Sequence, residues 1–154
     1  MKTKRWFVDC SRELSTTDPQ ITQAAELLRQ NEVVAFPTET VYGLGANAEN
    51  TEAVTKIYEA KGRPSDNPLI VHISHISQLD RFISHIPDTA KKLMKLFWPG
   101  ALTLVLPCKP GVLSPRVTAG LETVAVRMPD HPVALALISS AGLPIAAPSA
   151  NLSG

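Results

Sequence analysis

Apolar residues recur at helical spacing along much of the chain. Four apolar residues between Ile21 and Leu28 stand at i, i+3, i+4 and i+7, which predicts a helix with one buried face. Asp18 and Pro19 precede them as an N-cap and a first-turn proline, so we expect this helix to continue to about Gln30. Similar patterns predict four further helices, from about 51 to 61, 79 to 86, 90 to 97 and 130 to 141.

Short apolar runs between these helices predict strands. They lie at 6–8, 33–36, 69–73, 102–106, 123–127 and 144–147. Gly62 and Gly142 are placed to end two of the helices, and Pro99-Gly100 stops a third. Strands and helices alternate through most of the sequence, which predicts an open α/β sheet with helices packed on it. No internal repeat or linker divides residues 1–154, so we predict one domain.

Composition and charge narrow the function classes. With 44% apolar and 19% charged residues, the chain is typical of globular rather than disordered proteins. Its net charge of +1 gives no overall field to hold it on nucleic acid or an anionic membrane, so any cationic function must be local. The basic N-terminus is followed by an apolar stretch that stops at Val8, which predicts neither a signal peptide nor a membrane span. Cys10 and Cys108 lack paired spacing, and a reducing cytoplasm is the expected location.

Polar residues gather in three segments, 37–45, 61–68 and 148–154. Loops at strand ends are where α/β sheets usually form their ligand crevice. Lys61 and Arg63 stand beside two prolines, and a stiff cationic loop suits a phosphate or a carboxylate. On spacing alone, both cations can equally well serve only to complement the helix dipole. Ser149 and Asn151 likewise either bind a ligand or form a turn.

Several single features have a plain structural reading. Residues 43–48 match the dinucleotide pattern GxGxxA, but residues 37–42 separate them from the preceding strand, so we predict a loop over 37–46 that either approaches a ligand or simply turns the chain. His72 and His75 are not spaced to share a face, which argues against metal ligation, and His72 is expected to be a hydrogen-bonded core residue. Arg127 ends an apolar strand and points either into a pocket or to solvent.

Four separated motifs, taken together, resemble the YrdC/YciO family. They are Pro37-Thr-Glu-Thr-Val-Tyr-Gly-Leu-Gly45, Lys61-Gly-Arg-Pro-Ser-Asp-Asn-Pro-Leu-Ile-Val-His72, Val124-Ala-Val-Arg-Met-Pro129 and Pro148-Ser-Ala-Asn-Leu-Ser-Gly154. The resemblance runs from about Ile21 to the last residue and extends to the family's bacterial threonylcarbamoyl-AMP synthases in particular. It implies a twisted open mixed α/β sheet around a large, positively lined cavity, which the glycine segment would border.

The resemblance also implies which residues form the site. The ATP-binding positions that it matches are Lys61, Arg63, Asn67, Thr123, Ser149 and Asn151. Within that set, Lys61 and Arg63 match the catalytic Lys-x-Arg motif. The positions that resemble threonine-binding residues are Thr40, His72 and Arg127, with Arg127 suited to the carboxylate. The resemblance implies no metal ligand from the protein.

The implied reaction is a nucleotidyl transfer. The amine of L-threonine attacks bicarbonate or CO2 to give a carbamate, and the carbamate oxygen attacks the α-phosphate of ATP and displaces pyrophosphate. The product, threonylcarbamoyl-AMP, would be used in tRNA threonylcarbamoyladenosine modification, with downstream tRNA-modifying proteins as candidate partners. Almost every reacting group is anionic, so fixed cations and a Mg²⁺ ion carried on ATP would position and stabilise them without a protein nucleophile.

Family members continue beyond the Ser-x-Asn segment. The resemblance therefore implies that this chain lacks the C-terminal part of the domain, and we expect it to show little activity by itself. Two alternatives remain open. One is an RNA-binding module without catalysis, which the near-neutral charge and 5% aromatic content weaken to at most a low RNA affinity. The other is a carbamoyl-transfer domain with a different acceptor.

Overall fold

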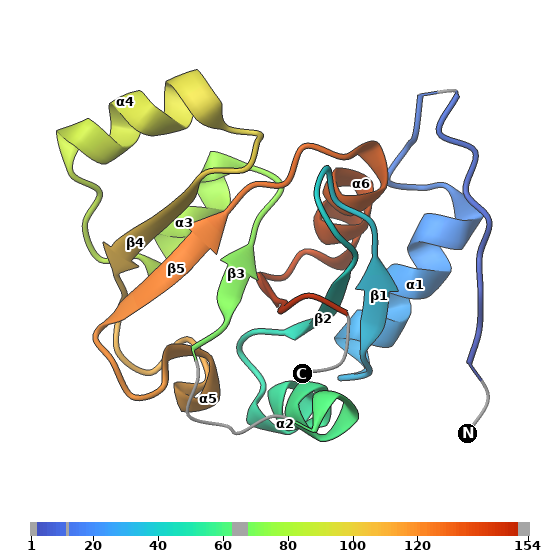
Figure 1. Cartoon of the computed structure of the whole chain (residues 1–154), viewed down its shortest axis with the longest axis horizontal. Helices are drawn as coiled ribbons and strands as arrows, with labels where there is room; N and C mark the ends of the chain where they lie inside the picture. The colour runs from blue at the N-terminus through green and yellow to red at the C-terminus, as the bar shows by residue number, and fades with distance from the viewer. Residues whose placement is uncertain (1–2, 12, 63–67, 151–154) are drawn as a thin grey trace.

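The computed structural model describes residues 3–11, 13–62 and 68–150 and shows a mixed, open, six-stranded sheet with helices packed against it (Figure 1). The strands are β1 Val34–Phe36, β2 Gly43–Asn47, β3 Ile70–His72, β4 Thr103–Pro107, β5 Thr123–Arg127 and β6 Ile145–Ala146. The helices are α1 Pro19–Arg29, α2 Thr51–Lys61, the 3-10 turn η1 Ile76–Gln78, α3 Leu79–Phe82, α4 Asp88–Phe97, α5 Pro115–Thr118 and α6 Pro132–Ala141. The predicted α/β class is confirmed.

The sheet has the strand order β1-β2-β6-β3-β5-β4. Strands β3 and β5 are parallel, and every other neighbouring pair is antiparallel. The two-residue strand β6 pairs with β2 on one side and with β3 on the other, so it joins the β1-β2 hairpin to the β3-β5-β4 half of the sheet. His72 and Arg127 are direct partners across the parallel pair, which places their side chains on the same face.

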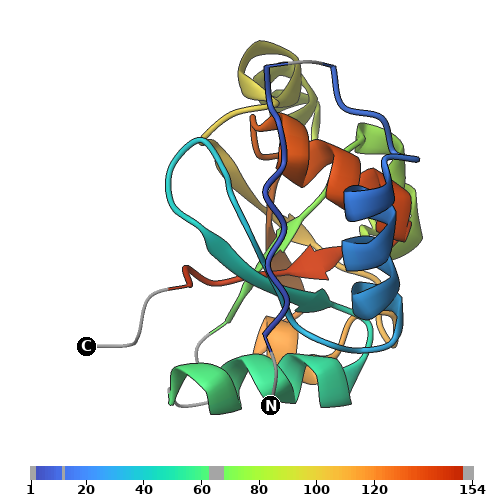
Figure 2. The same cartoon turned by 90° about the vertical axis from the view of Figure 1, so that its right-hand side faces the viewer.

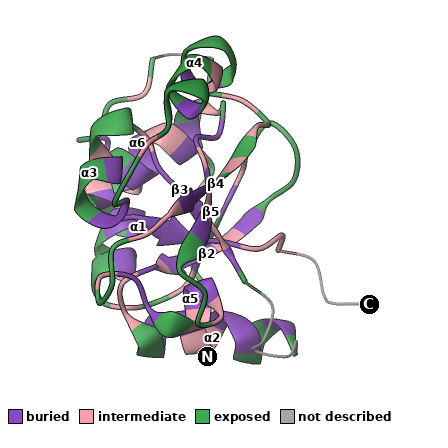
Figure 3. Cartoon of the chain, turned by 90° about the vertical axis from the view of Figure 1, so that its left-hand side faces the viewer, coloured by how far each residue is buried: buried purple, intermediate pink, exposed green. Residues whose placement is uncertain are grey.

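The two faces of the sheet are covered differently. Helices α1, α3 and α6 lie on one side of it, and α2 runs past the lower ends of the strands (Figure 2). The opposite side carries the loop between β1 and β2 and is free of described helices (Figure 2). Coloured by burial, the strands in the middle of the sheet are mostly buried, whereas α4 exposes much of its surface (Figure 3). The open side of the sheet is therefore where a ligand can reach the strand ends.

The predicted helix ends are confirmed at α1, α2 and α6. The Asp18 carboxylate accepts a hydrogen bond from the backbone N–H of Gln20 at 3.1 Å and caps α1. Gly62 and Gly142 end α2 and α6 with φ of 62° and 68°, a left-handed conformation that glycine adopts without steric cost. The predicted apolar stripe of α1 is buried throughout and packs on α6. These three helices were predictable because local signals set their ends.

Two predicted elements are wrong, and a third is only partly right. Residues 6–8 form no strand, because Trp6 and Val8 pack against the helical side of the molecule instead of pairing with a sheet edge. Residues 37–46 are not all loop, because β2 begins at Gly43. The helix predicted over 79–86 ends at Phe82, since Ile83 is extended and forms a bridge with Cys108. The short helix α5 has no counterpart among the predicted elements.

The glycines of β2 are explained by what lies against them. A Cβ atom at Gly45 would stand 2.7 Å from both the Phe36 ring and the Ile145 side chain. At Gly43 the nearest atom would be the tip of the Phe36 ring at 3.3 Å. Gly45 is therefore required for strand packing, a role that the dinucleotide-like spacing of the sequence does not reveal.

We expect Gly45→Ala to lower the free energy of unfolding by about 1–3 kcal/mol, the usual cost of forcing atoms into a well-packed core. Gly43→Ala, on the same strand and with more room, serves as the matched control and is expected to cost less. Urea unfolding of both variants measures the difference. Equal stability of the two variants would show that the Phe36 and Ile145 side chains move aside freely.

Candidate functional site

A cavity of ≈ 360 Å³ opens on the helix-free side of the sheet. Four segments that are far apart in the sequence form its walls: the loop before β2, the strand β3, the end of the strand β5, and the residues that follow β6. Its lining residues include the polar or charged Thr38, His72, Arg127 and Ser149. Gly43 also lines the cavity, as expected for a glycine segment that borders a ligand site. All four sequence motifs therefore contribute residues to one cavity.

Arg127 lies at the end of β5 and turns into the cavity rather than to solvent. Its side chain is only 13% exposed, and its Nη2 atom donates to the carboxylate of Glu39 and, at 3.3 Å, to the hydroxyl oxygen of Thr40. Burial lowers the pKa of Arg127, yet a guanidinium stays charged at any physiological pH. Within the described part of the chain, no acceptor pairs with its buried Nε atom. Arg127 is thus a fixed cation facing a site that could hold an anion.

His72 is the neutral neighbour of this cation. It is 4% exposed, and its Nδ1 atom lies 3.1 Å from the carbonyl oxygen of Ile70. The ring also meets Phe36 edge to face. Burial lowers the pKa of His72 to about 4, although the Ile70 and Ile145 carbonyls partly oppose this. The expected core histidine is confirmed, and it gives the cavity shape rather than charge.

Lys61 ties the end of α2 to the segment after β6. Its side chain is buried, and Nζ donates to the backbone carbonyl of Ser149 at 2.6 Å. Ser149 in turn pairs with Gly43 across an antiparallel bridge. The adjoining Ala150 N–H donates to the Tyr42 carbonyl at 2.8 Å. Two residues that the family resemblance assigns to ATP binding, Lys61 and Ser149, are therefore neighbours, although 88 residues separate them.

The remaining candidates are placed differently. Thr40 is exposed and lies against Arg127. Thr123 is exposed at the opposite end of β5 from Arg127 and does not line the cavity. Arg63, Asn67 and Asn151 lie outside the described residues. Their assignment to ATP binding stays a prediction.

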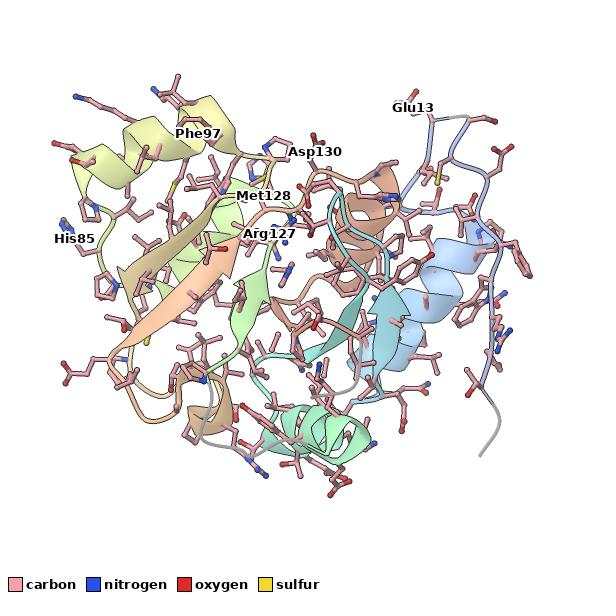
Figure 4. The ribbon with its side chains drawn as sticks, in the orientation of Figure 1. Glu13, His85, Phe97, Arg127, Met128 and Asp130 are labelled. Carbon is pink, nitrogen blue, oxygen red and sulfur yellow. The ribbon has the colours of Figure 1, made fainter. Side chains whose placement is uncertain are left out.

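Sequence reasoning missed Glu39. Its carboxylate contacts Arg127 through one oxygen and accepts from the backbone N–H of Asp130 at 2.7 Å through the other. Figure 4 shows Arg127 and Asp130 near the tip of the loop between β1 and β2. The one available signal was an acidic residue among the hydroxyl side chains of 37–42, and nothing in the sequence paired it with an arginine 88 residues away.

Among residues 3–11, 13–62 and 68–150, no group of three or more His, Cys, Asp and Glu side chains could hold a metal ion. None of the helices in those ranges has the length and apolar character that crossing a membrane requires.

The chain is similar to a known family and to solved members of it. The Sua5/YciO/YrdC family model, described as "Telomere recombination", matches residues 26–154. A Bacillus subtilis protein named threonylcarbamoyl-AMP synthase is 80% identical over the whole chain, which covers 44% of that protein. Pyrococcus abyssi Sua5 complexed with L-threonine superposes with a TM-score of 0.85 at 58% identity, over 88% of this chain and 39% of that one. Escherichia coli YciO superposes with a TM-score of 0.73 at 27% identity, over 84% and 62%. The chain thus spans less than half the length of the first two relatives.

Proposed function

The chain belongs to the Sua5/YciO/YrdC family, and on that basis we propose that the protein makes threonylcarbamoyl-AMP and pyrophosphate from L-threonine, bicarbonate and ATP. The observation that carries the proposal is a cavity that brings together positions from both predicted binding sets. Arg127 and Ser149 line it, and the Ser149 carbonyl accepts a hydrogen bond from the buried Lys61. A relative with this fold has been solved with L-threonine, which supports the amino acid as the smaller ligand.

Arg127 is proposed to bind the carboxylate of L-threonine. A guanidinium presents several N–H donors in one plane, which suits a carboxylate better than a lysine would. The hydroxyl of Thr40 lies beside it and can add a hydrogen bond. His72 is neutral, so it neither repels the ammonium group of the amino acid nor competes for its carboxylate. Together these residues would leave the amine directed toward the open cavity.

The other side of the cavity is proposed to hold ATP. Ser149 lines the cavity and Lys61 contacts it, and by resemblance Arg63, Asn67 and Asn151 complete the set. Thr123, which the resemblance also assigns to ATP, lies at the other end of β5 and would contact a part of the nucleotide outside the cavity. The amine of threonine attacks bicarbonate to give a carbamate with loss of water, and the carbamate oxygen then attacks the α-phosphate as the bond to pyrophosphate breaks. Fixed cations favour this transfer because negative charge accumulates on the phosphate oxygens in the transition state. No side-chain nucleophile is needed.

Magnesium is proposed to enter as part of the MgATP substrate. The described residues around the cavity offer hydroxyl groups and cations rather than a carboxylate cluster, which fits an ion that keeps phosphate and water ligands. Bound in that way, magnesium would neutralise phosphate charge. The product would pass to an enzyme that transfers the threonylcarbamoyl group to tRNA.

We expect L-threonine to bind at least about tenfold more tightly than L-serine or L-valine. Serine lacks the methyl group and valine lacks the hydroxyl, so each loses one of the two features that such a pocket reads. Isothermal titration with and without MgATP measures the three affinities, and pyrophosphate release that requires both threonine and bicarbonate tests the reaction. Equal binding of all three amino acids would refute the threonine assignment.

A further inference from the structure

Hydrogen bonds hold the base of the loop between β1 and β2 and also connect residues within the loop. At its base, the N–H of Leu44 donates to the Pro148 carbonyl at 2.9 Å, and the Tyr42 carbonyl accepts from Ala150. Within the loop, the Thr38 hydroxyl donates to the Val41 carbonyl at 2.6 Å. These bonds give the loop a shape, but they do not attach its tip to the strands on the far side of the cavity.

Glu39 makes that attachment. One carboxylate oxygen contacts Arg127 at the end of β5, and the other accepts from Asp130 just before α6. The Glu39 side chain is 23% exposed and that of Arg127 is 13% exposed, so the pair is more shielded than an ordinary surface ion pair. In the described part of the chain, the other bond between this tip and β5 is the 3.3 Å contact of Thr40 with the same guanidinium.

The nitrogen atoms of the Arg127 guanidinium have different surroundings. Its Nη2 atom is engaged by Glu39 and Thr40, whereas Nε has no partner among the described residues. A partly buried guanidinium with no counter-charge is costly, and burial already lowers the pKa of Arg127. Glu39 supplies the counter-charge and fixes the plane of the group. It does not itself line the cavity, so a ligand that enters need not displace it.

We propose that Glu39 is a positioning residue, which holds Arg127 and the tip of the 37–42 loop in the arrangement that receives the carboxylate of the amino-acid substrate. The inference rests on the proposed threonine site. Glu39 does not itself line the cavity and acts on the substrate through Arg127. The alternative is that Glu39 occupies Arg127 in place of the ligand and has to leave. The bond from Asp130 opposes that alternative, because it keeps the Glu39 carboxylate in place independently of Arg127.

The test compares Glu39→Ala and Glu39→Gln with the wild type. Glu49→Ala is the matched control, because Glu49 forms a two-bond ion pair with Arg81 outside the cavity. Hydrogen exchange of the amides of residues 38–42 reports on the loop without any ligand. Titrations with L-threonine, with L-threoninol, which lacks the carboxylate, and with MgATP then report on the site.

We expect amide exchange at 38–42 to rise about threefold or more in Glu39→Ala and to stay unchanged in Glu49→Ala. L-threonine affinity should fall about tenfold or more in Glu39→Ala, while affinities for L-threoninol and MgATP change less than about twofold. Glu39→Gln keeps one acceptor oxygen, which can meet either the Arg127 guanidinium or the Asp130 N–H but not both, and it should lie between. A structural effect alone would weaken all three ligands together.

Three other outcomes would contradict the positioning role of Glu39 or the proposed threonine site. Unchanged loop exchange in Glu39→Ala overturns the inference whether or not threonine binds. Tighter threonine binding by Glu39→Gln than by the wild type would mean that Glu39 competes with the ligand. If loop exchange rises as expected but the wild type binds no L-threonine, the proposed function fails and the positioning of Arg127 is retained for another carboxylate.

Discussion

Arg127→Ala is expected to weaken L-threonine binding by about 10- to 150-fold and to leave MgATP binding within about twofold, since a charge-assisted contact contributes roughly 1.5–3 kcal/mol. The loss falls on one ligand because Arg127 takes no part in the Lys61–Ser149 contact: its guanidinium bonds to Glu39 and Thr40, whereas Lys61 bonds to Ser149. Isothermal titration of each ligand measures both affinities. By resemblance, Arg63→Ala is the reciprocal variant, with the larger loss for MgATP.

The control for Arg127→Ala is Arg81→Ala. Arg81 also pairs with a glutamate, but it is exposed on α3 and does not line the cavity. Its removal should change neither ligand affinity. A loss of less than about twofold for threonine in Arg127→Ala would mean that Arg127 serves only as the partner of Glu39, and that the carboxylate is bound elsewhere.

Acid should destabilise the protein through His72. The pKa of this residue is about 4 in the folded chain against an ordinary 6.5, so at intermediate pH the unfolded chain binds a proton that the folded chain excludes. Stability from the neutral ring is therefore complete above about pH 6.5 and is lost progressively as the pH falls to about 4, by about 3 kcal/mol in all.

Urea unfolding at pH 7 and at pH 4.5 measures this loss in the wild type and in His72→Gln, which has no titrating ring. We expect the variant to lose less stability between the two pH values, whatever its stability at pH 7. His85→Gln removes an exposed histidine and controls for the change of residue type. If the stability of the wild type and of His72→Gln depended on pH in the same way, the pKa of His72 would have to be the same in the folded and the unfolded chain.

The parts of the fold that were predictable are those fixed by local chemistry. Helix α1 begins at Pro19 after the Asp18 cap, and helix α2 ends at its Gly62 cap, as predicted. The side chain of Asp18, the ring of Pro19 and the backbone freedom of Gly62 are local properties that the sequence shows directly. The helix predicted across Ile83 failed because an apolar periodicity cannot reveal that a backbone will pair with a distant strand. The loop predicted over residues 43–45 was wrong for a similar reason. These residues form a strand because they pair with β1 and pack against Phe36, and local sequence does not reveal such tertiary contacts.

Some residues of the candidate site could also be predicted from the sequence, and others could not. Arg127 at the end of an apolar strand and Lys61 at the end of a helix were visible as unusual charges, and the family resemblance assigned them roles. Glu39 was not visible, because its partner is distant in sequence and a lone glutamate in a polar loop is normally solvated. His72 could be predicted as a core residue from its apolar strand, but its neutral state follows from burial that only the assembled sheet supplies.

The position of strand β6 affects the order in which the sheet can fold during synthesis of the chain. The hairpin β1-β2 and the group β3-β5-β4 can each pair internally from residues that leave the ribosome earlier. They become one sheet when Ile145–Ala146 inserts between β2 and β3, and the pairing of Ala46 with Ala146 spans about 100 residues. Such distant pairing forms late, because the loop entropy is lost before the contacts are gained. The walls that carry Arg127, Gly43 and Ser149 meet across that joint. The cavity therefore forms only once Ile145–Ala146 has joined the two groups of strands.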